Sequence, residues 1–138
     1  MSEIDRMDPG QESQPWSIHR VGVVGMGLIG GSIALDLTQQ GVEVQGLVHR
    51  EVTAERARSR GLAPLVSTDH SCLQDCDLVI LALPLESLLT PEESLLSALP
   101  EQAVVTDVGS VKAEVLAVWR DLHPRFVGSH PMAGTAQV

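Results

Sequence analysis

Apolar residues along the chain fall in short runs, and these are separated by segments with the features of helices or turns. Six such runs occur, at residues 20–24, 42–48, 65–66, 77–84, 103–107 and 126–128. The clearest, D-L-V-I-L-A-L-P, is apolar on both faces and ends at Pro84, which cannot continue a ladder of hydrogen bonds. Runs of this kind are typical of strands buried in a parallel sheet.

Four segments between these runs have the spacing or the boundary residues of helices. They cover residues 28–40, 54–60, 91–99 and 111–122. In the first, Ile29, Ile33 and Leu37 recur every four residues and predict one buried stripe. Gly41 follows this segment and fits the C′ position of a helix.

Two further helix starts are indicated by capping residues. Thr90 fits an N-cap, with Pro91 at the first helical position and Glu93 three residues after the cap. Ser110 fits the N-cap of the last helix. Only the link between the third and fourth strands has no clear pattern.

Strands that alternate with helices predict an α/β fold with a doubly wound parallel sheet, of the Rossmann type. With one Phe, two Trp and no Tyr in the chain, the core is expected to be aliphatic. In such a sheet, ligands bind outside the carboxyl ends of the strands. The glycines, arginine, serine and histidine discussed below each follow a strand, so we expect them to gather on that edge.

The segment at 20–32, R-V-G-V-V-G-M-G-L-I-G-G-S, joins a strand to a helix through a G-x-G-x-x-G motif. In this context the motif predicts a dinucleotide-binding turn, with the pyrophosphate at the helix N-terminus. The alternative is a glycine-rich turn that binds nothing. The candidate cofactor-binding residues of the loop are Gly25, Met26, Gly27, Leu28, Ile29 and Gly30.

The end of the second strand bears on the choice of cofactor. NAD-binding folds carry an acidic residue there, which bonds the ribose hydroxyls. This chain has Val48, followed by His49 and Arg50, which favours NADP over NAD because cations attract the 2′-phosphate. Two observations leave NAD open: Arg50 could simply begin a solvated helix, and Glu51 adds a carboxylate close by.

Charge and composition exclude several classes of partner. The 138 residues predict one domain, and 18 Asp and Glu against 9 Lys and Arg give a formal net charge of −9. This balance argues against a nucleic-acid-binding protein, and any anionic ligand must be held by local donors. The sequence has no run of about 18 apolar residues, so no membrane partner is expected.

Residues 1–17 are expected to form a flexible leader, because prolines and a glycine interrupt a polar stretch that lacks signal-peptide features. Two cysteines, Cys72 and Cys76, then indicate a reducing cytoplasm. His70 and these cysteines offer at most three metal ligands, without a C-x-x-C pair. We therefore expect no metal, and a structural role for both cysteines.

Four segments together resemble the prephenate/arogenate dehydrogenase family of tyrosine biosynthesis: G-M-G-L-I-G-G-S, D-L-V-I-L-A-L-P, V-V-T-D-V-G-S-V-K and G-S-H-P-M-A-G-T. The resemblance covers about residues 18–138. It is nearest to the NADP-using arogenate dehydrogenases of cyanobacterial and plant type. It implies an NADP-binding domain at 18–138 and oxidative decarboxylation of arogenate to tyrosine, or of prephenate to 4-hydroxyphenylpyruvate.

The resemblance also assigns roles to residues. It implies that His130 is catalytic near the substrate's ring hydroxyl and that Ser110 positions this hydroxyl and the nicotinamide. Thr135 falls in the segment that leads into the pocket for the small anionic substrate. Further cofactor contacts are expected from Leu83, Pro84 and Gly109.

The alternatives for these residues are structural. His130 precedes a proline and could be fixed in a constrained loop, and Ser110 could serve only as a helix cap. For Lys112 we expect a structural ion pair rather than a catalytic role.

The reaction implied by the resemblance explains these residue types. Hydride leaves the carbinol carbon for the nicotinamide while a general base takes the hydroxyl proton. A histidine suits this task because its reference pKa is about 6.5. The developing dienone is a vinylogous β-keto acid, so it loses carbon dioxide and becomes aromatic.

The family carries a second, helical domain, which forms a homodimer and supplies most of the substrate pocket. No such segment follows in this sequence, so we expect the chain alone to bind dinucleotide and to turn over poorly. Two other functions remain open: a non-catalytic dinucleotide-binding module, and a hydroxyacid or imine reductase on the same fold. The latter would share the glycine motif without needing H-P-M-A-G.

Overall fold

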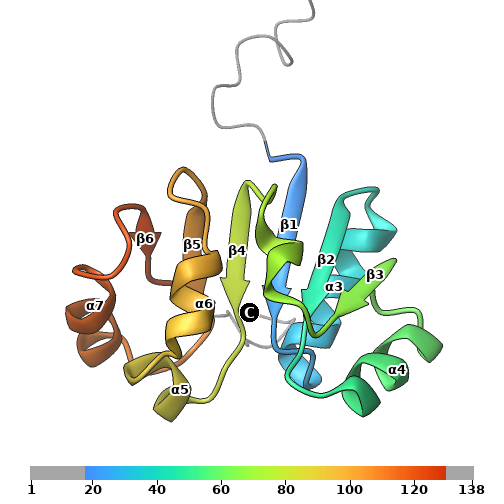
Figure 1. Cartoon of the computed structure of the whole chain (residues 1–138), viewed down its shortest axis with the longest axis horizontal. Coiled ribbons are helices and arrows are strands. Elements are labelled where there is room, and N and C mark those ends of the chain that lie inside the picture. The colour runs from blue at the N-terminus through green and yellow to red at the C-terminus, as the bar shows by residue number, and fades with distance from the viewer. Residues whose placement is uncertain (1–17, 130–138) are drawn as a thin grey trace, which may run out of the picture.

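The computed structural model describes residues 18–129 and contains one six-stranded sheet (Figure 1). The strand order is β3-β2-β1-β4-β5-β6, and every neighbouring pair is parallel. This is the order of a Rossmann sheet, which confirms the predicted doubly wound α/β fold. The strands are β1 (Arg20–Val24), β2 (Glu43–Leu47), β3 (Leu65–Ser67), β4 (Leu78–Leu81), β5 (Val104–Asp107) and β6 (Phe126–Val127).

Helices connect the strands at the predicted places, with two additions. A 3-10 helix, η1, fills the uncertain link between β3 and β4, and α5 begins directly after Pro84. None of the helices among residues 18–129 is both long and apolar enough to cross a membrane. The helical elements are α3 (Leu28–Gln39), α4 (Glu51–Ser59), η1 (His70–Leu73), α5 (Leu85–Leu89), α6 (Glu93–Ala98) and α7 (Ala113–Trp119).

Two apolar clusters form the core, one under α3 and α4 and the other under η1, α5, α6 and α7. Successive residues of a strand point to opposite faces of the sheet, so one strand contributes to both clusters. In β4, Ile80 belongs to the first cluster and Val79 to the second. The core is aliphatic as predicted, except where buried Trp119 stacks on Phe126 with ring centroids 5.2 Å apart.

The predicted buried stripe on the first helix is confirmed only in part, since Ile33 and Leu37 are half-buried and pack against the core. The buried residues of α3 are Gly30, Gly31 and Ala34, whereas Ile29 is 48% exposed. Only glycine fits at position 30, because a Cβ atom there would stand 1.9 Å from the carbonyl oxygen of Gly25 in the preceding turn and 3.0 Å from the Cβ atom of Ala82 after β4. The fully buried part of this contact is therefore made by small residues.

The predicted caps are partly confirmed. Gly41 follows the C-cap of α3 with φ +87°, as expected. Thr90 ends α5 instead of starting the next helix, because α6 begins at Glu93 after an N-cap at Glu92. Ser110 is not the cap of α7, which begins at Ala113, since the preceding loop folds around Asp107.

Candidate dinucleotide site

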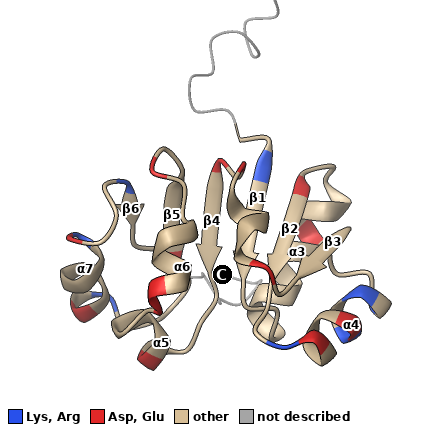
Figure 2. Ribbon diagram, in the orientation of Figure 1, with Lys and Arg blue, Asp and Glu red and all other residues tan. Residues whose placement is uncertain are grey.

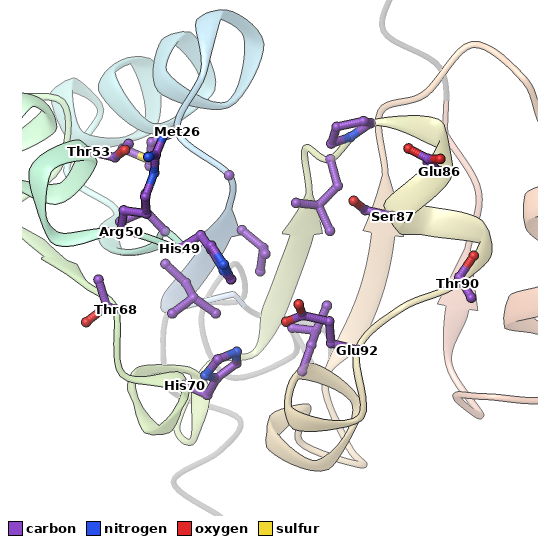
Figure 3. Close-up of a pocket in the computed structure, with 17 residues that line it drawn as sticks. Met26, His49, Arg50, Thr53, Thr68, His70, Glu86, Ser87, Thr90 and Glu92 are labelled. Atoms are coloured by element: carbon purple, nitrogen blue, oxygen red, sulfur yellow. The ribbon is translucent and has the colours of Figure 1, made fainter.

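A cavity of about 810 Å³ opens at the carboxyl ends of β1, β2 and β4 (Figure 3). This is the edge where the sequence predicts ligand binding, at the point where the strand order reverses. Six predicted cofactor residues line it: Gly25, Met26, His49, Arg50, Leu83 and Pro84.

The glycine turn after β1 has the geometry that the motif predicts. Gly25 has φ +95°, and a Cβ atom there would lie 2.4 Å from the carbonyl oxygen of Ala82. Its N–H donates to the carbonyl oxygen of Leu47 at 2.8 Å, which ties the turn to β2. A Cβ atom on Gly27 would meet nothing within 4 Å, so the backbone at the N-cap of α3 faces open space. No side chain caps this helix end, which leaves its first N–H groups available to an anion.

Two basic side chains follow β2 at the cavity wall. Figure 3 shows His49 pointing into the cavity and Arg50 lying beside Met26 and Thr53. Both His49 and Arg50 are exposed.

A second hollow, of about 420 Å³, shares Met26 and Thr53 with the first cavity. It lies along Gly27 and Leu28, and Arg56 and Arg60 line it. Figure 2 shows basic positions on α4 and on the loop before it, with acidic positions between them on the helix. This end of the site is basic although the chain as a whole is acidic.

The carboxylate of Glu51, which leaves NAD open in the sequence, is paired. Nη1 of Arg58 donates to Oε2 of Glu51 at 3.0 Å. Among residues 18–129, neither Arg50 nor Arg56 forms an ion pair. The positive charge of these two arginines is therefore not compensated within the described part of the chain.

The opposite wall comes from the segments after β3 and β4, and sequence reasoning missed most of it. Nε2 of His70 lies 3.5 Å from Oγ of Ser94 on α6, and Figure 3 shows His70 and Glu92 at the same end of the cavity. Position just after a strand was the available signal for Thr68, whereas Ser87 lies within α5. Besides Val24, Leu47 and Val48 at the strand ends, the lining residues that the sequence did not indicate are Thr53, Thr68, His70, Glu86, Ser87, Thr90, Glu92 and Leu95.

The remaining predicted residues lie outside this cavity. Ile29, Gly30, Gly109 and Ser110 line neither hollow, and Gly27 and Leu28 line only the second. Ser110 is exposed in the loop after β5, and the N–H of Gly109 donates to Oδ2 of Asp107 at 3.0 Å. His130 and Thr135 fall outside the described residues.

The two cysteines are buried to different degrees on η1 and just after it. Burial raises the pKa of the Cys72 thiol to about 11 and that of Cys76 to about 12. Both are free thiols, and Cys76 belongs to the core. Within residues 18–129, no three His, Cys, Asp or Glu side chains are grouped so as to hold a metal ion.

Several known proteins are similar to this chain over most of its length. Residues 33–138 match the family model described as "Prephenate dehydrogenase, nucleotide-binding domain". The cyclohexadienyl dehydrogenase of Zymomonas mobilis is 31% identical over 120 residues, which covers 83% of this chain and 41% of that protein.

Solved structures are similar over the same region. Synechocystis arogenate dehydrogenase superposes with a TM-score of 0.71 at 37% identity, covering 85% of this chain and 42% of that one. Prephenate dehydrogenase from A. aeolicus, in complex with hydroxyphenyl propionate and NAD+, gives a TM-score of 0.74 at 33% identity, with 86% and 43% covered. The chain therefore spans less than half the length of these relatives.

Proposed function

The chain belongs to the prephenate dehydrogenase family as its nucleotide-binding domain, and from this premise we propose that it binds NADP for the oxidative decarboxylation of arogenate. Prephenate is the alternative substrate. The observation that carries the proposal is the turn at Gly25–Gly30. Gly25 lines the main cavity together with Arg50, and the open backbone at Gly27 borders the adjoining hollow, which shares Met26 and Thr53 with that cavity.

The preference for NADP rests on the charges after β2. No carboxylate stands at the end of this strand, and the nearest one, on Glu51, is engaged by Arg58. Arg50 borders the main cavity and Arg56 the adjoining hollow, with Thr53 lining both. A 2′-phosphate between Arg50 and Thr53 would meet a guanidinium and a hydroxyl, which are donors suited to a phosphate. The A. aeolicus enzyme was solved in complex with NAD+, and that observation concerns the cofactor of that enzyme alone.

In this proposal the nicotinamide supplies a hydride acceptor. The chain's own residues align the substrate and move one proton: His130 takes the proton of the ring hydroxyl at an imidazole nitrogen, and Ser110 hydrogen-bonds the same hydroxyl. Alignment of this kind is worth roughly 7–11 kcal/mol of a reaction barrier. Loss of the ring carboxylate as carbon dioxide then restores aromaticity without a further catalytic group. The arogenate assignment is supported by the H-P-M-A-G-T segment and by the likeness to the Synechocystis enzyme.

The test is turnover of arogenate with NADP in a protein in which residues 1–138 are followed by the helical domain expected from the resemblance. His130→Asn is expected to lower kcat by about 10²–10⁴-fold, the range of general base catalysis, with dinucleotide binding retained. His19→Asn, the same change at an exposed position before β1, is the control and should turn over normally. Unchanged turnover in His130→Asn would contradict the proposed role of His130. No turnover in the unsubstituted protein, with dinucleotide still bound, would favour a dinucleotide-binding module without catalysis.

A further inference from the structure

A buried carboxylate ends β5 and collects donors from two separate segments. Asp107 has no exposed surface. Its Oδ2 accepts the N–H of Gly109 at 3.0 Å and the ammonium of Lys112, and its Oδ1 accepts the N–H of Ser129 at 3.3 Å. The side chain of Asp107 therefore joins the loop after β5 to Ser129, which lies two residues after the end of β6.

Lys112 makes the second half of this connection. Besides its ion pair with Asp107, its Nζ donates to the carbonyl oxygen of Ser129 at 2.6 Å. The N–H of Ser129 is held by Asp107 and its C=O by Lys112, so both backbone polar groups of this one residue have charged partners.

The hydroxyl of Ser129 is held as well. It donates to the carbonyl oxygen of Asp107 at 2.6 Å and lies 2.9 Å from the hydroxyl of Thr106. Because a hydroxyl has one proton, Thr106 must be the donor in the second contact. Ser129 is thus fixed at its N–H, its C=O and its Oγ, although it is an exposed residue after a strand of only two residues.

Such a buried ion pair is a weak source of stability, because desolvation offsets most of the attraction. Its effect is better described as orientation: it determines where the backbone of Ser129 points. The next residue in the sequence is His130, and Ser110 lies in the loop that Asp107 and Lys112 hold.

We propose that Asp107 and Lys112 are positioning residues, which clamp the backbone of Ser129 and thereby fix the start of the segment that carries His130 relative to Ser110. The inference rests on the proposed role of His130. It extends that proposal to two side chains that line neither of the two hollows at the dinucleotide site.

The test follows two sites by NMR in the intact chain: the Ser129 amide and the ring of His130, whose signal is identified by its loss in His130→Asn. In Lys112→Met, amide exchange at Ser129 is expected to accelerate by at least about tenfold while exchange at Val79 in the central strand stays slow. The His130 ring signal should shift. Lys112→Arg, which keeps a donor and the charge, should restore both readouts. Arg120→Met, an exposed cation at the end of α7, should match the wild type.

A folded Lys112→Met chain with wild-type Ser129 exchange and a wild-type His130 signal would overturn the inference. If this variant does not fold, the double variant Asp107→Asn with Lys112→Met takes its place, because it leaves no buried charge unpaired. Amide exchange at Ser129 and the His130 ring signal are then measured in the double variant, with the same two outcomes. Failure of the proposed function is seen separately, as undiminished turnover in His130→Asn.

Discussion

Nη1 of Arg58 lies 3.0 Å from Oε2 of Glu51, and Glu51 is the residue that follows Arg50. Arg58 is itself anchored, because its Nε and Nη2 donate to the carbonyl oxygen of Val66 at 3.2 and 2.8 Å. The one carboxylate beside the end of β2 is thus neutralised by a fixed partner. In a chain with a formal charge of −9, this contact leaves the basic end of the cavity free to attract a phosphate.

Arg50→Ala is expected to weaken NADPH binding by about tenfold or more and to leave NADH binding unchanged, because only NADPH carries the 2′-phosphate. Isothermal titration of both dinucleotides measures the two affinities. Arg120→Ala, which removes an exposed arginine from the end of α7, is the control. An equal loss of affinity for NADPH and NADH would show that Arg50 does not bind the 2′-phosphate.

Two glycines of one turn are expected to respond oppositely to alanine. A Cβ atom on Gly27 meets nothing within 4 Å, so Gly27→Ala should fold with a normal melting temperature. The same methyl group would occupy space meant for a pyrophosphate, so dinucleotide affinity should fall by about tenfold or more.

Gly30→Ala should instead destabilise the fold, by about 1–3 kcal/mol or more, because the new methyl group would stand 1.9 Å from a backbone oxygen. Urea unfolding of both variants separates the two effects. A Gly27→Ala chain that binds dinucleotide as the wild type does would mean that the turn is not the phosphate cradle.

Sequence patterns predicted most of this fold because its signals are local. The glycine turn, the apolar strand β4, which ends at Leu81 rather than at the predicted Pro84, and the glycine after α3 each depend on neighbours within a few residues. The buried stripe on α3 was predicted only in part, since periodicity reports where apolar residues recur and not where the backbone leaves room only for glycine, as at Gly30.

The candidate site was predicted less completely, for a related reason. The wall formed by Thr68, His70 and Glu92 comes from segments without a motif, which meet only because β2, β1 and β4 are neighbours in the sheet. The contacts between Asp107 and Ser129 span 22 positions, and no spacing rule reaches that far. Ser110 was mistaken for a cap because its loop is shaped by those contacts.

Trp119 connects α7 to α5 through its Nε1, which donates to the carbonyl oxygen of Leu88 at 2.8 Å. Trp119→Phe is expected to lower the free energy of unfolding by about 1–3 kcal/mol, because the buried acceptor loses its donor. Equilibrium urea unfolding followed by circular dichroism measures the change. Trp119→Phe as stable as the wild type would mean that this hydrogen bond adds nothing to the stability of the fold.

The thiols of Cys72 and Cys76 should stay protonated in the native chain at pH 8, because burial raises their pKa values to about 11 and about 12. A disulfide reagent should therefore react slowly with native protein and rapidly in urea. Since the ordinary thiol pKa is 9.0, the native chain binds more protons than the unfolded chain above that pH. The free energy of unfolding should then fall as the pH rises from 9 towards 11. In Cys72→Ala with Cys76→Ala, this contribution should vanish.

The first measurement is a titration of the chain with NADPH and, separately, with NADH, after circular dichroism has shown that the chain is folded. Nicotinamide fluorescence gives both dissociation constants. We expect NADPH to bind at least about tenfold more tightly, since Arg50 and its neighbours meet a phosphate that NADH lacks. Equal or tighter binding of NADH would contradict the NADP assignment, and a folded chain that binds neither would contradict the dinucleotide site itself.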